Sequence, residues 1–305
     1  MIDPFVSVII PNYNHAKYLD ERIQSILKQT YQNFELIILD DKSTDNSVEV
    51  INKYQDNPHV SCVVVNKENS GSTFKQWHKG FEIAKGELIW VAESDDICKI
   101  ELLETLVQFF IKDPKCVLAY TESVFFRDSD GELIRTHDDK DSELYEGKDF
   151  ISTKMINGNS IANASSALFR RSVALSIDKQ YTNYKGAGDR LFWIEIAEQG
   201  NVGVDYHSLN YYRVHEYNST KRNYSEGINQ KEDYKILNYI FHKGYITKNQ
   251  FRKSKLDYVR FRILTNENLD YHIKKDICRF WEITIFDKLY IEFLNLLDIA
   301  KYKLG

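Results

Sequence analysis

The stretch Leu88-Ile89-Trp90-Val91-Ala92-Glu93-Ser94-Asp95-Asp96 joins an apolar run directly to three acidic side chains. A short apolar run bounded by polar residues is typical of a buried strand, so the acids would leave the sheet at the strand's carboxyl end. Carboxylates this close repel one another unless a cation or hydrogen-bond donors compensate them. The stretch therefore indicates either a divalent metal that carries a phosphorylated ligand, or a solvated acidic turn.

A second strand end has the same form, because Asp40-Asp41 follows the apolar run 34–39. Short apolar runs alternate with helical patterns along the first part of the chain. They begin with a strand over 6–10, which Pro11 should end because proline cannot donate to a sheet ladder. This alternation predicts right-handed βαβ units, and hence an α/β fold with a mostly parallel central sheet flanked by helices. Such sheets bind ligands at the carboxyl ends of their strands, which favours a site over a turn.

The same patterns predict the neighbouring elements. We expect helices over 18–28 and 100–112, a helix through 77–84 that ends at Gly86, strands over 60–65 and 117–120, and a hairpin over 123–135. The polar residues 136–143 follow no pattern, which indicates a surface loop.

The end of the chain has a different character. From Ser225 onward, charged residues interleave with aromatic and aliphatic ones at helical spacing, which predicts a helical extension over 225–305 behind a main domain over 1–224. One apolar helix face stands out within this extension, formed by Phe286, Leu289, Tyr290, Phe293 and Leu297. We expect this face to pack on the main domain; the alternatives are a homodimer contact and peripheral contact with a membrane.

Composition narrows the class of protein. The net charge of -5 gives no general basic surface, so we expect no nucleic-acid partner. Four cysteines stand far apart, which indicates neither a zinc site nor a disulfide framework. The N-terminus has no secretory signal pattern, and no apolar segment approaches the roughly 20 residues that cross a bilayer. We therefore expect a cytoplasmic protein, with the C-terminal helix as a candidate for contact with the inner face of the membrane.

The opening Val6-Ser7-Val8-Ile9-Ile10-Pro11-Asn12-Tyr13-Asn14 resembles the start of family 2 glycosyltransferases. The segments 26–31, 34–45 and 84–87 resemble the same family in the expected order. The resemblance covers roughly the first two thirds of the chain. It implies the GT-A fold, a Rossmann-like arrangement that binds nucleotide-diphosphate sugars.

The resemblance also implies roles for the strand-end residues. Tyr13, in the loop that Pro11 begins, would lie against the nucleotide base, and Asp41 would accept a hydrogen bond from the base ring. Asp95 would hold the ribose hydroxyls. Asp96 would ligate the Mn2+ or Mg2+ that bridges the two phosphates.

Two positions in the first half of the chain depart from the commoner family pattern. Glu93 stands where aspartate is usual, which keeps the charge but lengthens the reach. Lys75 lies in a segment that usually carries arginine and asparagine, and it either approaches a phosphate or the base, or is a solvated helix lysine.

The second half of the chain supplies further candidates. Asp189, in the segment 186–193, resembles the family's catalytic acid and would take the proton of the acceptor hydroxyl; the alternative is a helix N-cap. Gly188 precedes it where many relatives have glutamate. His215 resembles the histidine that ligates the metal or contacts the diphosphate, with a structural histidine as the alternative. Arg213 would offset phosphate charge or pair with an internal acid.

These expectations describe an inverting, metal-dependent glycosyltransferase. Its donor would be a nucleotide-diphosphate sugar, most simply a UDP-sugar, and its acceptor a hydroxyl of a saccharide or of a lipid-linked acceptor in polysaccharide or glycolipid biosynthesis. A non-catalytic sugar-nucleotide-binding scaffold of the same fold is the first alternative. A sugar nucleotidyltransferase is the second, although the segment 11–14 replaces the glycine-rich loop that such chemistry needs.

Overall fold

The computed structural model describes residues 3–129, 131–135, 141–215 and 219–304. The strands in these residues are β1 (Val6–Asn12), β2 (Phe34–Asp40), β3 (Val60–Val65), β4 (Leu88–Val91), β5 (Ile97–Cys98), β6 (Cys116–Arg127), β7 (Gly131–Arg135), β8 (Glu143–Glu146), β9 (Ala167–Arg170) and β10 (Asn201–Arg213). They form one sheet in the order β3-β2-β1-β4-β9-β6-β10-β5, with β7 beside β6 and β8 beside β10.

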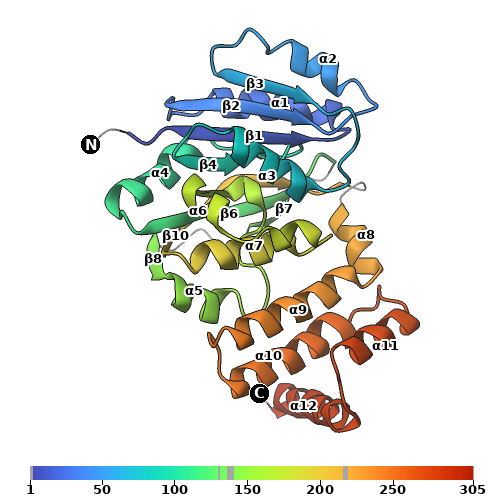
Figure 1. Cartoon of the computed structure of the whole chain (residues 1–305). Coiled ribbons are helices and arrows are strands. Elements are labelled where there is room, and N and C mark those ends of the chain that lie inside the picture. The colour runs from blue at the N-terminus through green and yellow to red at the C-terminus, as the bar shows by residue number, and fades with distance from the viewer. Residues whose placement is uncertain (1–2, 130, 136–140, 216–218, 305) are drawn as a thin grey trace.

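Helices connect and cover these strands (Figure 1). They are α1 (Ala16–Leu27), α2 (Ser47–Asn52), α3 (Thr73–Ile83), α4 (Leu102–Lys112), α5 (Gly147–Lys154), α6 (Arg171–Ser176), α7 (Gly188–Ala197), α8 (Ser219–Ser225), α9 (Ile228–His242), α10 (Lys248–Tyr258), α11 (Tyr271–Phe280) and α12 (Ile285–Leu304). A π-helical turn, η3 (Val259–Leu264), continues α10, and the 3-10 turns η1 (Ala164–Ser166) and η2 (Lys179–Asn183) precede β9 and α7.

Both faces of the sheet are buried, as the continuous apolar runs predict. Along β1, Ile9 packs in the core shared with α3 and α7, whereas Val8 and Ile10 pack in the core shared with α1 and α4. Successive side chains of a strand point to opposite faces, so one run of apolar residues fills two cores. The predicted α/β fold with helices on both faces of its sheet is confirmed.

The strand order creates a crevice at one edge of the sheet. β1 pairs in parallel with β2 on one side and with β4 on the other. The chain moves outward from β1 through β2 to β3 and then crosses back to place β4 on the other side of β1, so the loops that follow β1 and β4 separate at their carboxyl ends. In open α/β sheets this switch point is where ligands bind. The segment after β4 is the acidic one, Glu93–Asp96.

The prediction that Pro11 ends the first strand is wrong, because β1 continues to Asn12 and Pro11 pairs with Leu39 of β2. Ile9 accepts a hydrogen bond from Ala92 on the β4 side, so the nitrogen of Pro11, two residues later, faces the same side. β4 has already ended there, at Val91. The missing N–H therefore breaks no ladder bond.

Most other boundaries agree with the predicted ones. The strand over 60–65 is confirmed as β3, and the expected helices over 18–28 and 100–112 correspond to α1 and α4, each displaced by one or two residues at an end. The hairpin over 123–135 is formed by β6 and β7. Of the expected loop over 136–143, residues 136–140 lie outside the described part of the chain, and the rest leads into β8.

The C-terminal part is helical, as predicted, and lies at the end of the molecule away from β3 (Figure 1). The predicted packing of the apolar face of α12 is wrong, since Phe286 is 77% exposed and Phe293 54%. The opposite side of α12 packs instead, through buried Ile291 and through Asn295, which accepts a hydrogen bond from Arg260 at 2.7 Å. None of the helices in the described residues is long and apolar enough to span a membrane.

Candidate active site

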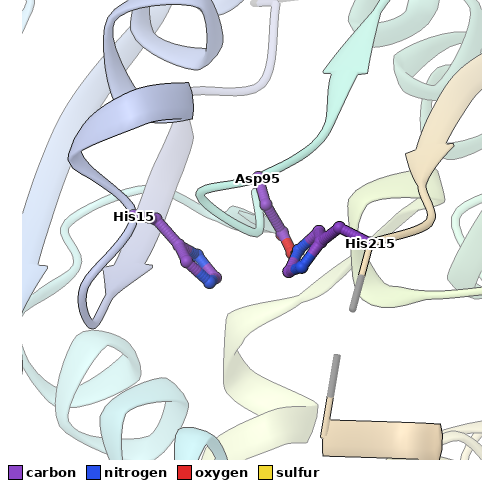
Figure 2. A group of neighbouring side chains, drawn as sticks. All are labelled: His15, Asp95 and His215. Atoms are coloured by element: carbon purple, nitrogen blue, oxygen red, sulfur yellow. The ribbon is translucent and has the colours of Figure 1, made fainter. Parts of the chain in front are cut away.

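Three side chains from distant segments meet at the switch point. His15 precedes α1 in the loop after β1, Asp95 lies in the loop after β4, and His215 follows β10. Their ligand-type atoms lie within 4.8 Å of one another. Figure 2 shows the three side chains approaching one another from different parts of the chain.

Hydrogen bonds and ring contacts hold this cluster in place. His215 Nε2 lies 2.9 Å from Asp95 Oδ2, and His15 Nδ1 lies 2.8 Å from the hydroxyl of Ser94. The ring of Tyr18 stacks on that of His215 with 5.3 Å between centroids. Because Nδ1 of His15 is engaged by Ser94, its Nε2 is left as the ligand atom, the usual arrangement for a metal-binding histidine.

The protonation states suit a divalent cation. Burial raises the pKa of Asp95, but the hydrogen bond from His215 and the positive charge that His15 and His215 carry at acidic pH outweigh it, so the pKa lies below its ordinary value. Burial lowers the pKa of His15. At neutral pH Asp95 is thus ionised and His15 neutral, and these are the forms that bind metals. Two imidazoles and one carboxylate fit Mn2+ better than Mg2+, which prefers an all-oxygen shell.

Asp96 faces away from this cluster. Its Oδ2 accepts hydrogen bonds from Asn163 and from Ser165 at 2.7 Å, and its Oδ1 accepts one from the backbone N–H of Arg213 at 3.0 Å. Burial, followed by the charge of Asp95, raises the pKa of Asp96 to about 7. This geometry gives Asp96 the contacts of a structural carboxyl that joins three segments.

The side chain of Glu93 also points toward the interior of the protein. Its Oε1 accepts a hydrogen bond from Trp77 Nε1 at 2.9 Å. Burial, then the charges of Asp95 and Asp96, raise the pKa of Glu93 to about 8. The side chain is therefore protonated at neutral pH, so the negative charge expected at this position is absent.

Arg22 lies beside the acidic loop, and no role was predicted for it from the sequence. Arg22 of α1 is fully buried, with its guanidinium 5.1 Å from the ring centroid of Trp90. Its positive charge opposes the burial that raises the pKa values of Glu93 and Asp96. The burial of Arg22 could have been inferred from the sequence, because Arg22 lies on the apolar face of α1, four residues before buried Ile26.

Asp40 and Asp41, at the second acidic strand end, accept hydrogen bonds from neighbouring loops. Asp41 accepts hydrogen bonds from Asn66 at 2.6 Å, from the N–H and hydroxyl of Ser70, and from Gln76 at 2.9 Å. Asn66 and Ser70 belong to the segment that leads into α3, and Gln76 lies in α3 itself. Asp40 likewise accepts from Asn12, at 2.8 Å. Asp41 therefore fixes the loop beside the crevice.

The other residues predicted to bind the donor differ in their exposure. Tyr13 is 47% exposed, with its ring available to a ligand, whereas Pro11 is buried within the extended β1. Lys75 is exposed on α3, and its Nζ donates to the carbonyl of Ser70 at 3.3 Å. The buried guanidinium of Arg213 pairs with two acids whose side chains are exposed, Glu21, at 2.5 Å, and Asp128.

Asp189 lies in the first turn of α7, but it is not the N-cap, a position that Ala187 occupies. Its Oδ2 accepts a hydrogen bond from Asn159 at 2.8 Å, and its Oδ1 accepts one from the N–H of Arg190 at 2.8 Å. Burial raises the pKa of Asp189 to about 6. A carboxylate with this pKa is ionised at neutral pH and still basic enough to accept a proton.

A chain of contacts links the start of α7 to the acidic loop. Gly188 packs so closely that an added Cβ would lie 2.6 Å from the ring of Phe74. Phe74 in turn meets Trp77 edge to face at 5.1 Å, and Trp77 donates to Glu93. No side chain fits at position 188, which accounts for the missing second acid beside Asp189.

Comparisons with known proteins identify the family and the fold of the chain. The sequence model of the family described as Glycosyl transferase family 2 matches residues 7–176. Glycosyltransferase GlyG of Streptococcus pneumoniae serotype 4 is 47% identical over 105 residues, which make up 34% of this chain and 34% of GlyG. The chain thus spans about a third of the length of that relative.

Solved structures show the same fold. S. aureus TarS in complex with UDP-GlcNAc has a TM-score of 0.65 at 19% identity, covering 84% of this chain and 72% of that one. The mannosyltransferase PcManGT from Pyrobaculum calidifontis, in complex with GDP-Man and Mn2+, has a TM-score of 0.60 at 15% identity and covers 98% of this chain and 81% of its own. The fold is therefore GT-A, and the chain belongs to glycosyl transferase family 2.

Proposed function

We propose that this chain is an inverting, metal-dependent glycosyltransferase that moves a sugar from a nucleotide-diphosphate donor to a hydroxyl acceptor. The observation that carries the proposal is the convergence of His15, Asp95 and His215 at the switch point of the sheet. Ligands of open α/β sheets bind at this place. Asp189, linked to the same edge through α3, supplies the acid–base group.

The metal assignment differs from the one that the family resemblance implies. His15, Asp95 and His215 would hold Mn2+, whereas both oxygens of Asp96 already accept hydrogen bonds from the protein. When bound, the cation would neutralise the charge of the departing diphosphate as a Lewis acid. Ser94 orients the ring of His15, and Tyr18 supports that of His215.

Asp189 acts as the general base. Its carboxylate takes the proton of the acceptor hydroxyl while that oxygen bonds to the anomeric carbon and the bond to the diphosphate breaks. A single displacement inverts the configuration at that carbon. Asn159 holds one carboxylate oxygen in place by its hydrogen bond at 2.8 Å.

The donor is most simply a UDP-sugar. The exposed ring of Tyr13 provides a flat face for the base, and Asp41 fixes the neighbouring loop that begins at Asn66. TarS is described in complex with UDP-GlcNAc and PcManGT in complex with GDP-Man, so both nucleotides belong in the test. The acceptor we propose is a saccharide or a lipid-linked saccharide.

The exposed face of α12 fits a second copy of the chain. The large apolar side chains on this face are Ile285, Phe286, Leu289, Tyr290, Phe293, Leu296 and Leu297. At roughly 200 Å² for a fully exposed side chain, they present about 800 Å², which is about one partner's share of a stable interface.

The charges on α12 favour an antiparallel pairing of two copies. Lys288 and Glu292 lie on the same flank of the apolar face. An antiparallel pairing would therefore place Lys288 of one copy beside Glu292 of the other, so that opposite charges meet. The helix carries three acidic and three basic residues, and thus lacks the basic excess of helices that bind anionic membranes.

A donor panel tests the proposed function. UDP- and GDP-sugars, each with Mn2+, are screened by thermal shift, and the best donor is then assayed for hydrolysis and for transfer, with NMR of the product's anomeric configuration. We expect one nucleotide class to stabilise the protein and the product to be inverted. Metal-dependent binding without hydrolysis or transfer would favour the scaffold alternative, and a retained configuration would contradict single displacement.

A further inference from the structure

The loop that precedes α7 is held by a single carboxylate of α9. Glu232 accepts hydrogen bonds from three consecutive backbone N–H groups, those of Lys185 at 2.9 Å, Gly186 at 2.9 Å and Ala187 at 2.8 Å. Glu232 is only 8% exposed. Hydrogen bonds from amides to a buried carboxylate are stronger than neutral ones, so this contact fixes the backbone two residues before Asp189.

The loop and α9 also fit each other sterically. Gly186 packs so closely on the side chain of Asn229 that an added Cβ would collide with it. The carboxylate of Glu232 lies at the N-terminal end of α7, where the helix dipole favours negative charge. Charge and shape therefore both join α9 to the start of α7.

Asp233, the next residue of α9, anchors Arg190, which directly follows Asp189. Asp233 accepts a hydrogen bond from Arg190 Nη1 at 2.6 Å and another from the hydroxyl of Tyr258 at 2.5 Å. Arg190 also donates to the carbonyl of Met155 at 2.5 Å. Asp189 thus lies between two anchored residues, and consecutive acids of α9 provide both anchors.

We propose that Glu232 is a positioning residue for the reaction, and that α9 is a component of the catalytic centre rather than an appendage. This inference rests on the proposed role of Asp189 as general base. A base misplaced by 1 Å loses much of its efficiency, because proton transfer requires hydrogen-bond distance to the acceptor hydroxyl. The three N–H contacts supply that precision without touching donor or metal.

The chemistry of the contact defines the test. Three donors converge on two oxygens, so Glu232→Gln replaces one acceptor by an amide N–H2 that faces other donors. Glu232→Asp keeps both oxygens but shortens the side chain. We expect kcat for transfer to fall about 10- to 100-fold in Glu232→Gln and less in Glu232→Asp, with the KM for the donor and the affinity for UDP and Mn2+ unchanged.

Two further variants complete the experiment. Ile291→Ala removes a buried contact of α12 and leaves the loop untouched, so it reports what destabilising the C-terminal helices does to kcat. Gly186→Ala displaces the same loop from α9 and replaces Glu232→Gln if that variant does not fold. We expect Gly186→Ala to lower kcat with unchanged UDP affinity, and Ile291→Ala to lower Tm with little change in kcat.

The outcomes separate this inference from the proposed function. If Asp189→Asn abolishes transfer but Glu232→Gln retains normal kcat, the positioning role is refuted and the function stands. The same holds if Ile291→Ala loses as much kcat as Glu232→Gln at an equal drop in Tm. If the wild-type protein shows no transfer, or Asp189→Asn retains turnover, the proposed function itself fails.

Discussion

Nε2 of His215 lies 2.9 Å from Oδ2 of Asp95, although the two residues are 120 positions apart in the chain. One follows β10 and the other follows β4. The strand order brings these two ends together, and His15 joins them from the loop after β1.

Substitutions of the neighbouring acids Asp95 and Asp96 should have different effects. Asp95→Asn removes a charged ligand, so we expect Mn2+-dependent UDP binding to weaken at least about tenfold, or 1.4 kcal/mol, in isothermal titration. Asp96→Asn disturbs the buried contacts with Asn163 and Ser165, so its larger effect should be a lower Tm. A normal Tm for Asp96→Asn together with lost metal dependence would restore the metal role to Asp96.

His15 should contribute to metal affinity. We expect His15→Ala to raise the Kd for Mn2+ at fixed UDP at least about tenfold, because one of three ligands is lost. His207→Ala is the matched control, since His207 is exposed on β10 and hydrogen-bonded to Asp205 instead. Equal Mn2+ affinity in both variants would remove His15 from the ligand set.

In the pH profile of kcat for transfer, an acidic limb should appear near pH 6, below which kcat decreases. Burial raises the pKa of Asp189 to about 6, and protonation below that value removes the base, so kcat falls as pH decreases. The hydrogen bond from Asn159 lowers this pKa, so Asn159→Ala should move the limb to higher pH. Asn157→Ala is the control, because Asn157 contacts Ser254. A limb that stays in place in Asn159→Ala would argue against Asp189 as the titrating group.

Glu195 of α7 should make the free energy of unfolding depend on pH. Burial, then the charges of Glu198 and Asp178, raise the pKa of Glu195 to about 7. Between about pH 4.5 and 7 the folded protein holds a proton that the unfolded chain releases, so stability falls as pH rises through this window. We expect Glu195→Gln to raise Tm at pH 8 but not at pH 4.5, by differential scanning fluorimetry. The exposed Glu49→Gln serves as control, and an equal response of both variants would contradict the prediction.

The apolar face of α12 should cause self-association. Because an exposed apolar patch of this size exceeds what monomers usually carry, we expect a concentration-dependent dimer in light scattering after size exclusion. The double variant Phe286→Ser with Phe293→Ser should be monomeric. Tyr271→Ser, an exposed aromatic on α11, is the control. A wild-type monomer at all concentrations that binds anionic vesicles would favour the membrane alternative.

Fold prediction succeeded where burial dictates the residue pattern. The strand over 34–39 was predictable because an apolar run of that length is buried on both faces. The strand over 60–65 lies at the edge of the sheet and is partly exposed, and it was predictable from its β-branched residues. The failure at Pro11 had a topological cause, since the cost of a proline depends on whether a neighbouring strand is still present. The apolar face of α12 was recognisable, but its pattern does not show which side meets Arg260.

The sequence predicted which strand ends form the site, but not which of their side chains point into it. The sequence places Asp95 and Asp96 at one strand end, but adjacent residues in a turn point in different directions. Only the distant partners Asn163 and Arg213 reveal that Asp96 faces inward. His15 was overlooked because a lone histidine after a strand has no distinctive spacing, and its partners come from loops far along the chain.

The buried carboxyl of Asp96 joins the β4 loop to the segment around Ser165 and to the end of β10. These contacts restrict how the enzyme can be recombined with its relatives. A chimera that exchanges everything after the loop that follows β4 must import partners that match Asp96, or replace Asp96 together with them. Exchange of the segments around Ser165 and the end of β10 without Asp96 would leave a buried carboxyl without its hydrogen-bond donors.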